Sequence, residues 1–202
     1  SNETQHTVTL TQGFWLSDHE VTQAEYQSVM AYNPSFFKGD DLPVEQVSWD
    51  EAVLYCQKLT RRERTAGRIT SHQEYRLPTE SEWEYAARAG TIGARYGDLD
   101  AIAWFGRDSG SQPHAAGGKQ ANAWGLRDMI GNVAEWCSDW YGEYPSESVT
   151  DPVGSGSGGL RVLRGASLAY DSAYCRAAYR SGREPTLRDR FVGFRTALSS
   201  VR

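Results

Sequence analysis

Three cysteines offer the most reactive side chains in this sequence: Cys56, Cys137 and Cys175. Two thiolates held close together bind a soft metal such as copper(I), and one thiolate of low pKa acts as a nucleophile. An odd number allows at most one disulfide and leaves one thiol free. The spacing contains no Cys-x-x-Cys pair and predicts no zinc site, and the four histidines are scattered, at His6, His19, His72 and His114.

Arginine is concentrated near the end of the chain. Nine arginines follow residue 160, against three acidic residues, although the whole chain carries a formal net charge of -5. An acidic chain is not expected to bind nucleic acid through its overall charge. Two interpretations of the arginines stay open: they pair with carboxylates inside the domain, or they form a cationic ligand-binding face.

Length and composition bound the fold that must position these groups. The chain is predicted to form a single domain over residues 1–202, with enough length to bury a core. Its 20 glycines, 11 tyrosines and 7 tryptophans favour a loop-rich fold held by large buried rings. No run of 18 apolar residues occurs, so no membrane span is predicted. The compartment stays open, with export or cell-surface display as one alternative.

Three capping boxes predict the starts of three helices. They lie at Thr22–Glu25, Ser48–Glu51 and Thr79–Glu82, and the first helix is expected to run to about Met30. In the second helix, Cys56 shares the apolar face with its neighbours at helical spacing. It is therefore predicted to be a buried apolar side chain and not a reactive thiol.

Strands are predicted at both ends of the chain. Residues 8–10 and 14–16 flank a turn at 12–13, and residues 160–163 and 192–198 are apolar enough for two more strands. Between residues 90 and 160, glycines and short aromatic islands replace periodicity. Loops of this kind need buried rings and contacts that hold them in place, for which a metal is one candidate.

Five sequence blocks follow one another along the chain. They include Val-Ser-Trp-Asp-Glu-Ala at 47–52, Arg-Leu-Pro-Thr-Glu-Ser-Glu-Trp-Glu-Tyr at 76–85 and Gly-Asn-Val-Ala-Glu-Trp at 131–136, preceded by 13–22 and followed by 161–165 with 193–195. Their order and spacing resemble the formylglycine-generating enzyme (sulfatase-modifying factor) family over nearly the whole chain. The resemblance implies a loop-rich α+β fold of the C-type-lectin-like kind, with short helices and small antiparallel sheets.

The block at 131–136 resembles a calcium-binding loop of the family. There the resemblance implies a structural calcium ion held by backbone carbonyls of Ile130, Gly131 and Val133 and by the carboxylate of Glu135. Oxygen ligands in a loop suit such a hard cation. The alternative is that Glu135 pairs with an arginine.

The copper chemistry of the family is not expected here. Its enzymes hold copper(I) between two cysteines that follow an Arg-Gly-Gly-Ser-like turn, and oxidise a substrate cysteine to formylglycine. In this chain Cys175 matches the second position, but Tyr170 occupies the first. A phenol oxygen cannot replace a thiolate on copper(I). Cys175 is catalytic only in the alternative that the chain is an oxidase or a divergent enzyme; otherwise it packs in the core or pairs with Cys137 in an oxidising compartment.

The segment around Cys175 alternates fixed framework positions with chemically mixed ones. Tyrosine and phenylalanine supply rigid contact area, and serine, glycine, aspartate and arginine supply adaptable polar contacts, as in a paratope. We therefore predict a ligand-binding face at Ala169, Tyr170, Asp171, Ser172, Tyr174, Tyr179, Ser181, Gly182, Arg183, Thr186, Leu187, Asp189, Arg190 and Phe191. The alternative is that the tyrosines are half-buried parts of a loop-rich domain.

The mixed positions share a coding property. Every residue type found there is encoded by a codon of the form NNC, as is asparagine, which the family often carries at such sites. Adenine-directed mutation of AAC codons would leave this pattern, which resembles the variable proteins of diversity-generating retroelements. The leading hypothesis is a non-catalytic module for a protein or cell-surface ligand. A fixed accessory domain and an enzyme are the alternatives, and the sequence predicts neither the ligand nor the oligomeric state.

Overall fold

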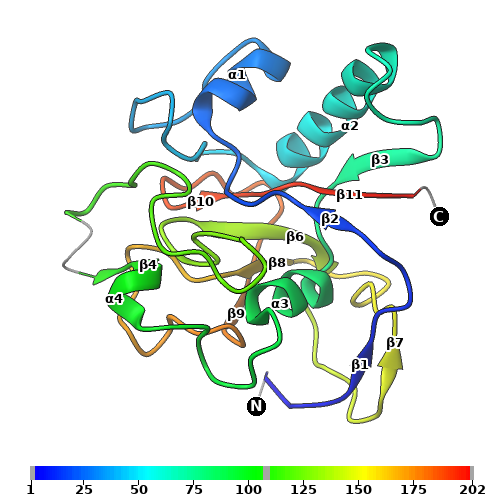
Figure 1. Cartoon of the computed structure of the whole chain (residues 1–202), viewed down its shortest axis with the longest axis vertical. Helices are drawn as coiled ribbons and strands as arrows, with labels where there is room; N and C mark the ends of the chain where they lie inside the picture. The colour runs from blue at the N-terminus through cyan, green and yellow to red at the C-terminus, as the bar shows by residue number, and fades with distance from the viewer. Residues whose placement is uncertain (1–2, 107–109, 201–202) are drawn as a thin grey trace.

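The computed structural model describes residues 3–106 and 110–200. Helices α1 (Gln23–Met30) and α2 (Trp49–Thr65) pack against each other on one side of a small sheet, and α2 contacts its strand β3 (Gln73–Arg76) (Figure 1). Helix α3 (Glu80–Arg88) packs against the second, larger sheet. A short helix α4 (Leu99–Ile102) opens the glycine-rich region.

All three predicted helix starts are confirmed. The side chains of Thr22, Ser48 and Thr79 each accept a hydrogen bond from the backbone N–H three residues later, and the glutamate there accepts from the cap residue's own N–H. These reciprocal bonds satisfy N–H groups that the first helical turn would leave unpaired. Cys56 lies on the buried face of α2, as predicted, and burial raises the pKa of its thiol.

Two small sheets form the centre. One has the order β10 (Val192–Gly193), β6 (Ala134–Trp140), β8 (Arg161–Arg164) and β9 (Arg180–Arg183); the other has the order β2 (Trp15–Leu16), β11 (Ala197–Ser200) and β3. Two further pairs join β1 (Val8–Thr9) to β7 (Val149–Thr150) and β4 (Ala103–Trp104) to β5 (Ile130–Gly131). The α+β class is confirmed, but β1–β7, β4–β5 and β10–β6 are parallel and not antiparallel as expected.

Two strand predictions are corrected: one in the pairing of the strands and one in the length of a strand. The strands at 8–10 and 14–16 exist, but β1 pairs with β7 and β2 pairs with β11, so they do not pair with each other. The single strand expected at 192–198 is divided into β10 and β11. Between them Phe194 packs on Tyr55 and Arg195 turns to Glu135, so both side chains are buried in a stretch that leaves one sheet for the other.

Large rings fill the core as expected. Trp83, Trp136 and Phe194 have no exposed surface, and the Trp136 indole donates to the Val47 carbonyl at 3.0 Å. Among the described residues, no helix is long and apolar enough to cross a membrane.

Buried polar side chains hold the glycine-rich loops between residues 90 and 160. Asn122 donates to the carbonyls of Ala86 and Ala87 at the end of α3 and accepts from two N–H groups of its own turn. The Asp128 carboxylate accepts from three successive backbone N–H groups at 117–119. These hydrogen bonds satisfy backbone groups of the loops and hold their turns in place.

Candidate ligand-binding face

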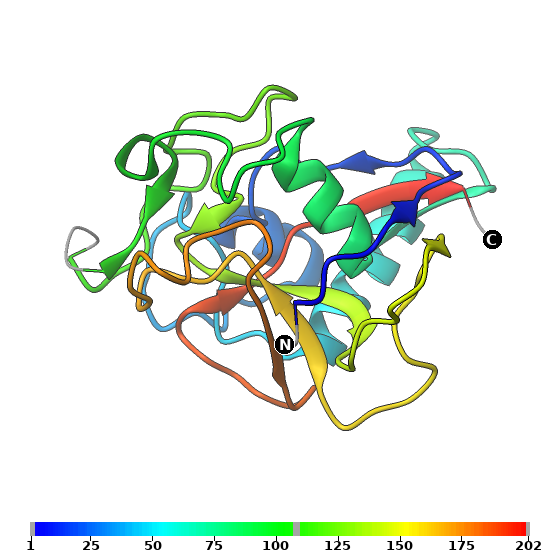
Figure 2. The ribbon, with the colours of Figure 1, turned by 90° about the horizontal axis from the view of Figure 1, so that it is seen from below.

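The segment between β8 and β10 combines an exposed surface with a buried framework. None of the fourteen predicted contact residues is buried: each side chain is exposed or half-buried. Of the framework positions, Arg164, Cys175, Ala177, Arg180 and Val192 are buried, whereas Arg176, Ala178 and Pro185 are half-buried and Arg188 is exposed. In Figures 1 and 2 the loops at 166–176 and 184–191 both lie on the side away from β1 and β7.

Three tyrosines form a cluster on this face. The ring centroids of Tyr170, Tyr174 and Tyr179 lie 5.2 to 5.5 Å from one another. Tyr174 is 44% exposed, whereas Tyr170 and Tyr179 also pack on a core cluster that includes Ile102 and Cys175. Burial and a hydrogen bond with Tyr170 raise the pKa of Tyr179. Two rings of the cluster, Tyr170 and Tyr179, are therefore supported by the core, and the third, Tyr174, is exposed at the surface.

Backbone contacts hold the loop that carries this cluster. The Arg95 guanidinium donates to the carbonyls of Cys175 and Ser172, both at 2.6 Å. The Ala177 N–H donates to the Ala94 carbonyl at 2.8 Å. Since these bonds use main-chain atoms of the loop, they do not depend on which side chains the exposed positions carry.

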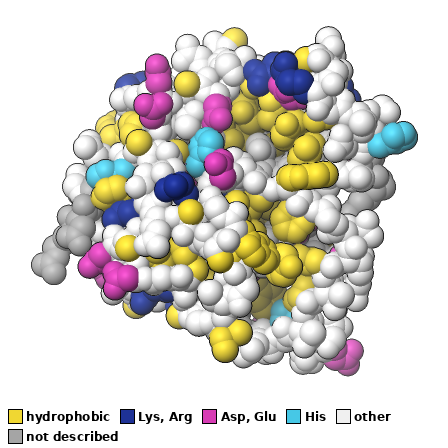
Figure 3. Space-filling view, in the orientation of Figure 1, with side chains coloured by type: hydrophobic (Ala, Val, Ile, Leu, Met, Phe, Trp, Pro, Cys, Tyr) yellow, Lys and Arg dark blue, Asp and Glu magenta, His cyan; other side chains and the backbone are white. Residues whose placement is uncertain are grey.

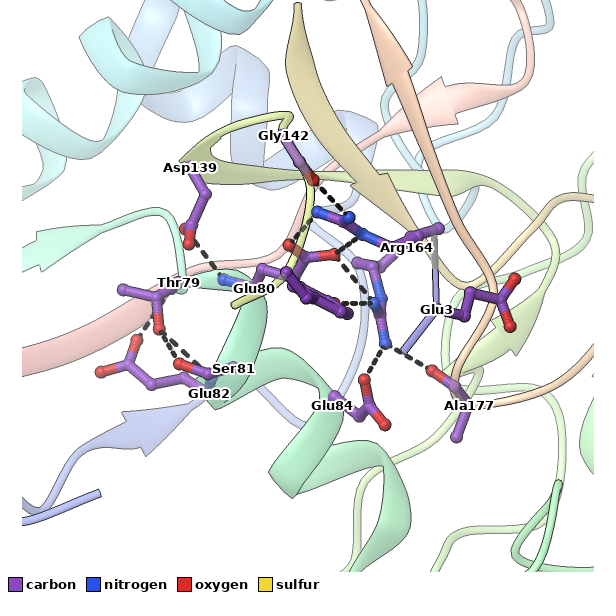
Figure 4. A network of polar contacts seen from close by, with 12 residues as sticks. Glu3, Thr79, Glu80, Ser81, Glu82, Glu84, Asp139, Gly142, Arg164 and Ala177 are labelled. Atoms are coloured by element: carbon purple, nitrogen blue, oxygen red, sulfur yellow. Dashed lines mark hydrogen bonds and ion pairs between the residues drawn. The ribbon is translucent and has the colours of Figure 1, made fainter. Parts of the chain in front are cut away.

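A buried network of charges holds β8 and β9 to α3 (Figure 4). Arg180 donates to both oxygens of Glu80 at 2.7 and 2.6 Å, and Arg164 donates to Glu80 at 2.9 Å, to Glu84 at 2.5 Å and to the Ala177 carbonyl at 2.6 Å. Burial alone would lower the pKa of Arg164, but Glu80 and Glu84 raise it. The guanidinium therefore stays charged, and its two terminal nitrogens are paired beneath the face, whereas its buried Nε has no hydrogen-bond partner among the described residues.

A second aromatic group lies at the other end of the segment. Phe191 stacks on Phe37 with centroids 6.4 Å apart, and the Arg190 guanidinium lies 4.9 Å from the Phe191 ring and 5.9 Å from the Phe36 ring. Phe36 is 62% exposed. Sequence reasoning missed Phe36 and Phe37, although two adjacent phenylalanines in a polar loop were a signal for them.

The remaining predicted residues serve the scaffold to different degrees. Leu187 packs against the main core, and the Asp189 carbonyl accepts from the Gln46 N–H at 3.0 Å. Gly182 lies against the Tyr141 ring, where an added Cβ would come within 2.7 Å of a ring carbon. Ser181 and Arg183 lie on β9 with half-buried and exposed side chains respectively.

Most of the C-terminal arginines pair with carboxylates. The interpretation that these arginines pair with carboxylates inside the domain is therefore confirmed for five of them: Arg164, Arg176, Arg180, Arg188 and Arg195. Arg161 lies instead between the rings of Trp49 and Trp140, at 3.6 and 3.4 Å. Arg183 and Arg190 have no ion-pair partner in the part of the chain that the structure describes, and both belong to the predicted face.

The sequence matches the sulfatase-modifying factor enzyme 1-like domain over residues 1–200. The chain belongs to this family. It is similar to Treponema denticola variable protein 1, with 34% identity, a TM-score of 0.88, and coverage of 95% of this chain and 86% of that one. The formylglycine-generating enzyme of Streptomyces coelicolor is 40% identical over 177 residues, which cover 77% of this chain and 52% of the enzyme.

A more distant structural likeness concerns the fold alone. The Major Tropism Determinant I1 variant has 16% identity and a TM-score of 0.54, and the match covers 92% of this chain and 50% of that one. The chain also spans only about half the length of the formylglycine-generating enzymes that it resembles, including the one from Streptomyces coelicolor.

The three cysteines of this sulfatase-modifying factor-like chain belong to three different clusters of the core. All three thiols are free and buried, so the pairing of Cys175 with Cys137 does not occur and the core alternative holds. Burial raises the pKa of Cys175 to about 11, and its Sγ lies 3.7 Å from the Asp171 carbonyl oxygen. Tyr170 supplies a ring to the tyrosine cluster at the position of the first cysteine.

Glu135, the carboxylate of the predicted calcium loop, is paired with Arg195. Glu135 accepts from Arg195 at 2.7 Å on each carboxylate oxygen, and one oxygen also accepts from the Trp83 indole at 2.7 Å. A calcium ion at Glu135 would have to displace this guanidinium, so the donors as arranged do not fit the ion. Among the described residues, no three acidic, histidine or cysteine side chains gather in a metal-binding group. The assignment of the Ile130, Gly131 and Val133 carbonyls as calcium ligands stays a prediction.

Proposed function

We propose that this chain is a non-catalytic binding module whose face at residues 169–191 takes a protein ligand. The observation that carries the proposal lies within one segment: fourteen exposed or half-buried residues surround the buried framework residues Cys175, Ala177 and Arg180. Loop backbone and framework side chains make most of the contacts that hold the fold, and Tyr170, Tyr179 and Leu187 add packing on the core, so the more exposed side chains of the face are available to a partner. Exposed tyrosines and arginines are the residue types that contribute most at protein interfaces.

The similarity to a variable protein supports the finer proposal that this face is diversified. That protein is 34% identical and matches over 95% of this chain. The fourteen positions also carry only residues that NNC codons encode. A scaffold whose loops are held through main-chain atoms suits such variation, since substitutions at the exposed sites leave those bonds in place.

Sequencing tests the diversification. The 3′ end of the gene and its flanking DNA would be read in many cells of the source population. A nearby imperfect repeat of the segment for residues 161–195, differing only at adenines, is expected. An invariant gene with no repeat would remove diversification and leave a fixed binding face.

The enzyme alternative has a separate test. A peptide with the Cys-x-Pro-x-Arg motif would be incubated with the protein, copper and oxygen, and its mass followed. We expect no change, because one thiolate cannot give copper(I) the two-coordinate site described above. Loss of the thiol with a gain of aldehyde would establish the oxidase instead.

A further inference from the structure

The loop between α1 and α2 carries a phenylalanine, Phe36, that is 62% exposed. In Figures 1 and 2 this loop lies beside the segment 184–191. Phe37 stacks on Phe191, and the Arg190 guanidinium lies 5.9 Å from the centroid of the Phe36 ring. The loop therefore continues the surface of the predicted face, although it comes from a distant part of the sequence.

Two buried polar side chains hold this loop in place. The Gln23 amide donates to the Phe37 carbonyl at 3.0 Å. Its oxygen accepts from the Gly39 N–H at 3.2 Å and from the Asn33 side chain at 2.8 Å. The Glu45 carboxylate accepts from the Phe37 N–H at 2.9 Å. Gln23 and Glu45 are at most 1% exposed, so the backbone of the loop is fixed from inside the domain.

This arrangement is not what folding alone would favour. An amide and a carboxylate lose water when they are buried, and their hydrogen bonds here hold the backbone of a loop whose aromatic ring stays in solvent. Turning that ring into the core would contribute more to stability. A loop that is ordered before it meets a partner lowers the entropy cost of association, and aromatic rings are enriched at protein interfaces.

We propose that residues 33–39 form an arm of the binding face, with Phe36 as an apolar anchor that contacts the same protein ligand as residues 169–191. This inference rests on the proposed function of that face. Arg190 and Phe191 join the two parts, because they are predicted contact residues and also contact the arm. A matching ligand presents an apolar pocket for Phe36 within its contact surface. Gln23 and Glu45 are positioning residues, since they act through the backbone that carries the ring.

Synthetic binding proteins serve as probes of the arm on the full chain. Monobodies would be selected from an unbiased library, and their affinities for the parent and for single variants measured by biolayer interferometry. Tyr174→Ala tests the face and Phe36→Ala tests the arm, and each should weaken most of the monobodies by about tenfold or more. Trp15→Ala is the matched control and should leave these monobodies unchanged. Trp15 is 65% exposed and lines a separate hollow beside α3, around which Figure 3 shows hydrophobic side chains.

The outcomes separate the arm from the face. Loss of affinity with Tyr174→Ala but not with Phe36→Ala would leave the proposed face in place and overturn the arm. Loss with neither variant, or with Trp15→Ala alone, would contradict the proposed function and the arm with it. Loss with Phe36→Ala alone would make the loop a separate interaction site and overturn its place in the face. Because all three side chains are exposed, circular dichroism should show the variants folded.

Hydrogen exchange tests the positioning role of Glu45. In Glu45→Ala the Phe37 N–H loses its acceptor, so this amide should exchange about tenfold faster or more, and the monobodies should associate more slowly. Glu45→Gln keeps an acceptor oxygen and should restore both rates to within about threefold of the parent. Unchanged exchange of the Phe37 amide in Glu45→Ala, or no restoration in Glu45→Gln, would show that Glu45 does not position the arm.

Discussion

The Arg180 guanidinium lies across both carboxylate oxygens of Glu80, at 2.7 and 2.6 Å, although 100 residues separate them in the chain. Both side chains are almost fully buried. The pair joins the first turn of α3 to β9, and Arg164 shares the same carboxylate. A charged group in this position stabilises the fold only while its partner is present.

Arg180→Met should therefore destabilise the protein by about 3 to 5 kcal/mol, because Glu80 loses two of its bonds inside the core. Urea unfolding measures the loss. Arg183→Met is the control on the same strand: its side chain is exposed, and we expect a change within about 0.5 kcal/mol. Equal effects of the two substitutions would show that the network does not hold β9.

Asp139 should make stability depend on pH. Burial raises the pKa of this carboxyl from 3.8 to about 7, so between these values the folded protein holds a proton that the unfolded chain has released. The free energy of unfolding then falls as pH rises from about 4 to 7. Asp139→Asn should remove that part of the decline, so the variant gains on the order of 1 kcal/mol or more relative to the parent between pH 4.5 and 7.5.

Denaturation at several pH values checks the Asp139 prediction. Asp171→Asn, at an exposed position, is the matched control and should change the free energy of unfolding by less than about 0.5 kcal/mol. If the free energies of unfolding of the parent and of Asp139→Asn change in parallel with pH, burial does not raise the pKa of Asp139.

The three thiols should be unreactive in the folded protein. Burial raises the pKa of Cys56, Cys137 and Cys175, so little thiolate is present at neutral pH and reagents cannot reach it. Ellman's reagent should label all three only after unfolding in guanidinium. Rapid labelling of Cys175 in the native state would instead favour a redox role.

Calcium should have little effect on stability. Arg195 occupies both oxygens of Glu135, so we expect EDTA or millimolar calcium to shift the Tm by less than about 1 °C. Differential scanning calorimetry measures this. A calcium-dependent rise of several degrees would mean that the ion displaces the guanidinium and that the predicted site at 130–135 forms.

Random substitution should separate the face from its framework. In a displayed library that varies the fourteen predicted contact residues, most members should resist protease, apart from changes at Gly182, where a Cβ would meet Tyr141, and at Tyr170, Tyr179 and Leu187, which pack on the core. A matched library at Arg164, Cys175, Ala177 and Arg180 should lose resistance, since these side chains are buried. Similar protease resistance in both libraries would contradict the distinction between a variable face and a buried framework.

Local signals in the sequence were sufficient for the helices. A capping box needs only residues three positions apart, so Thr22, Ser48 and Thr79 identified their helices without knowledge of the fold. Strand partners were not predictable in this way. The pairing of β1 with β7 joins Val8 to Val149, and nothing near Val8 encodes a partner so far along the chain.

The exposure of the candidate face was predictable from the sequence, but the contacts that support it were not. Composition identified the exposed residues of 169–191, since tyrosine, serine and arginine are typical of contact surfaces. The partner of Glu135 was not predictable, because the same carboxylate suits a calcium ion or Arg195 and only the fold places that arginine beside it. The roles of Phe36 and Arg95 depend on loops whose paths have no periodic signal.

The strand at the middle of the β2–β11–β3 sheet is the last strand in the chain. Leu198 lies between Trp15 and Tyr75, so neither neighbour can complete the sheet before residues 197–200 exist. A chain that stopped before residue 197 would leave β2 and β3 without their shared neighbour and would expose two unpaired strand edges to aggregation.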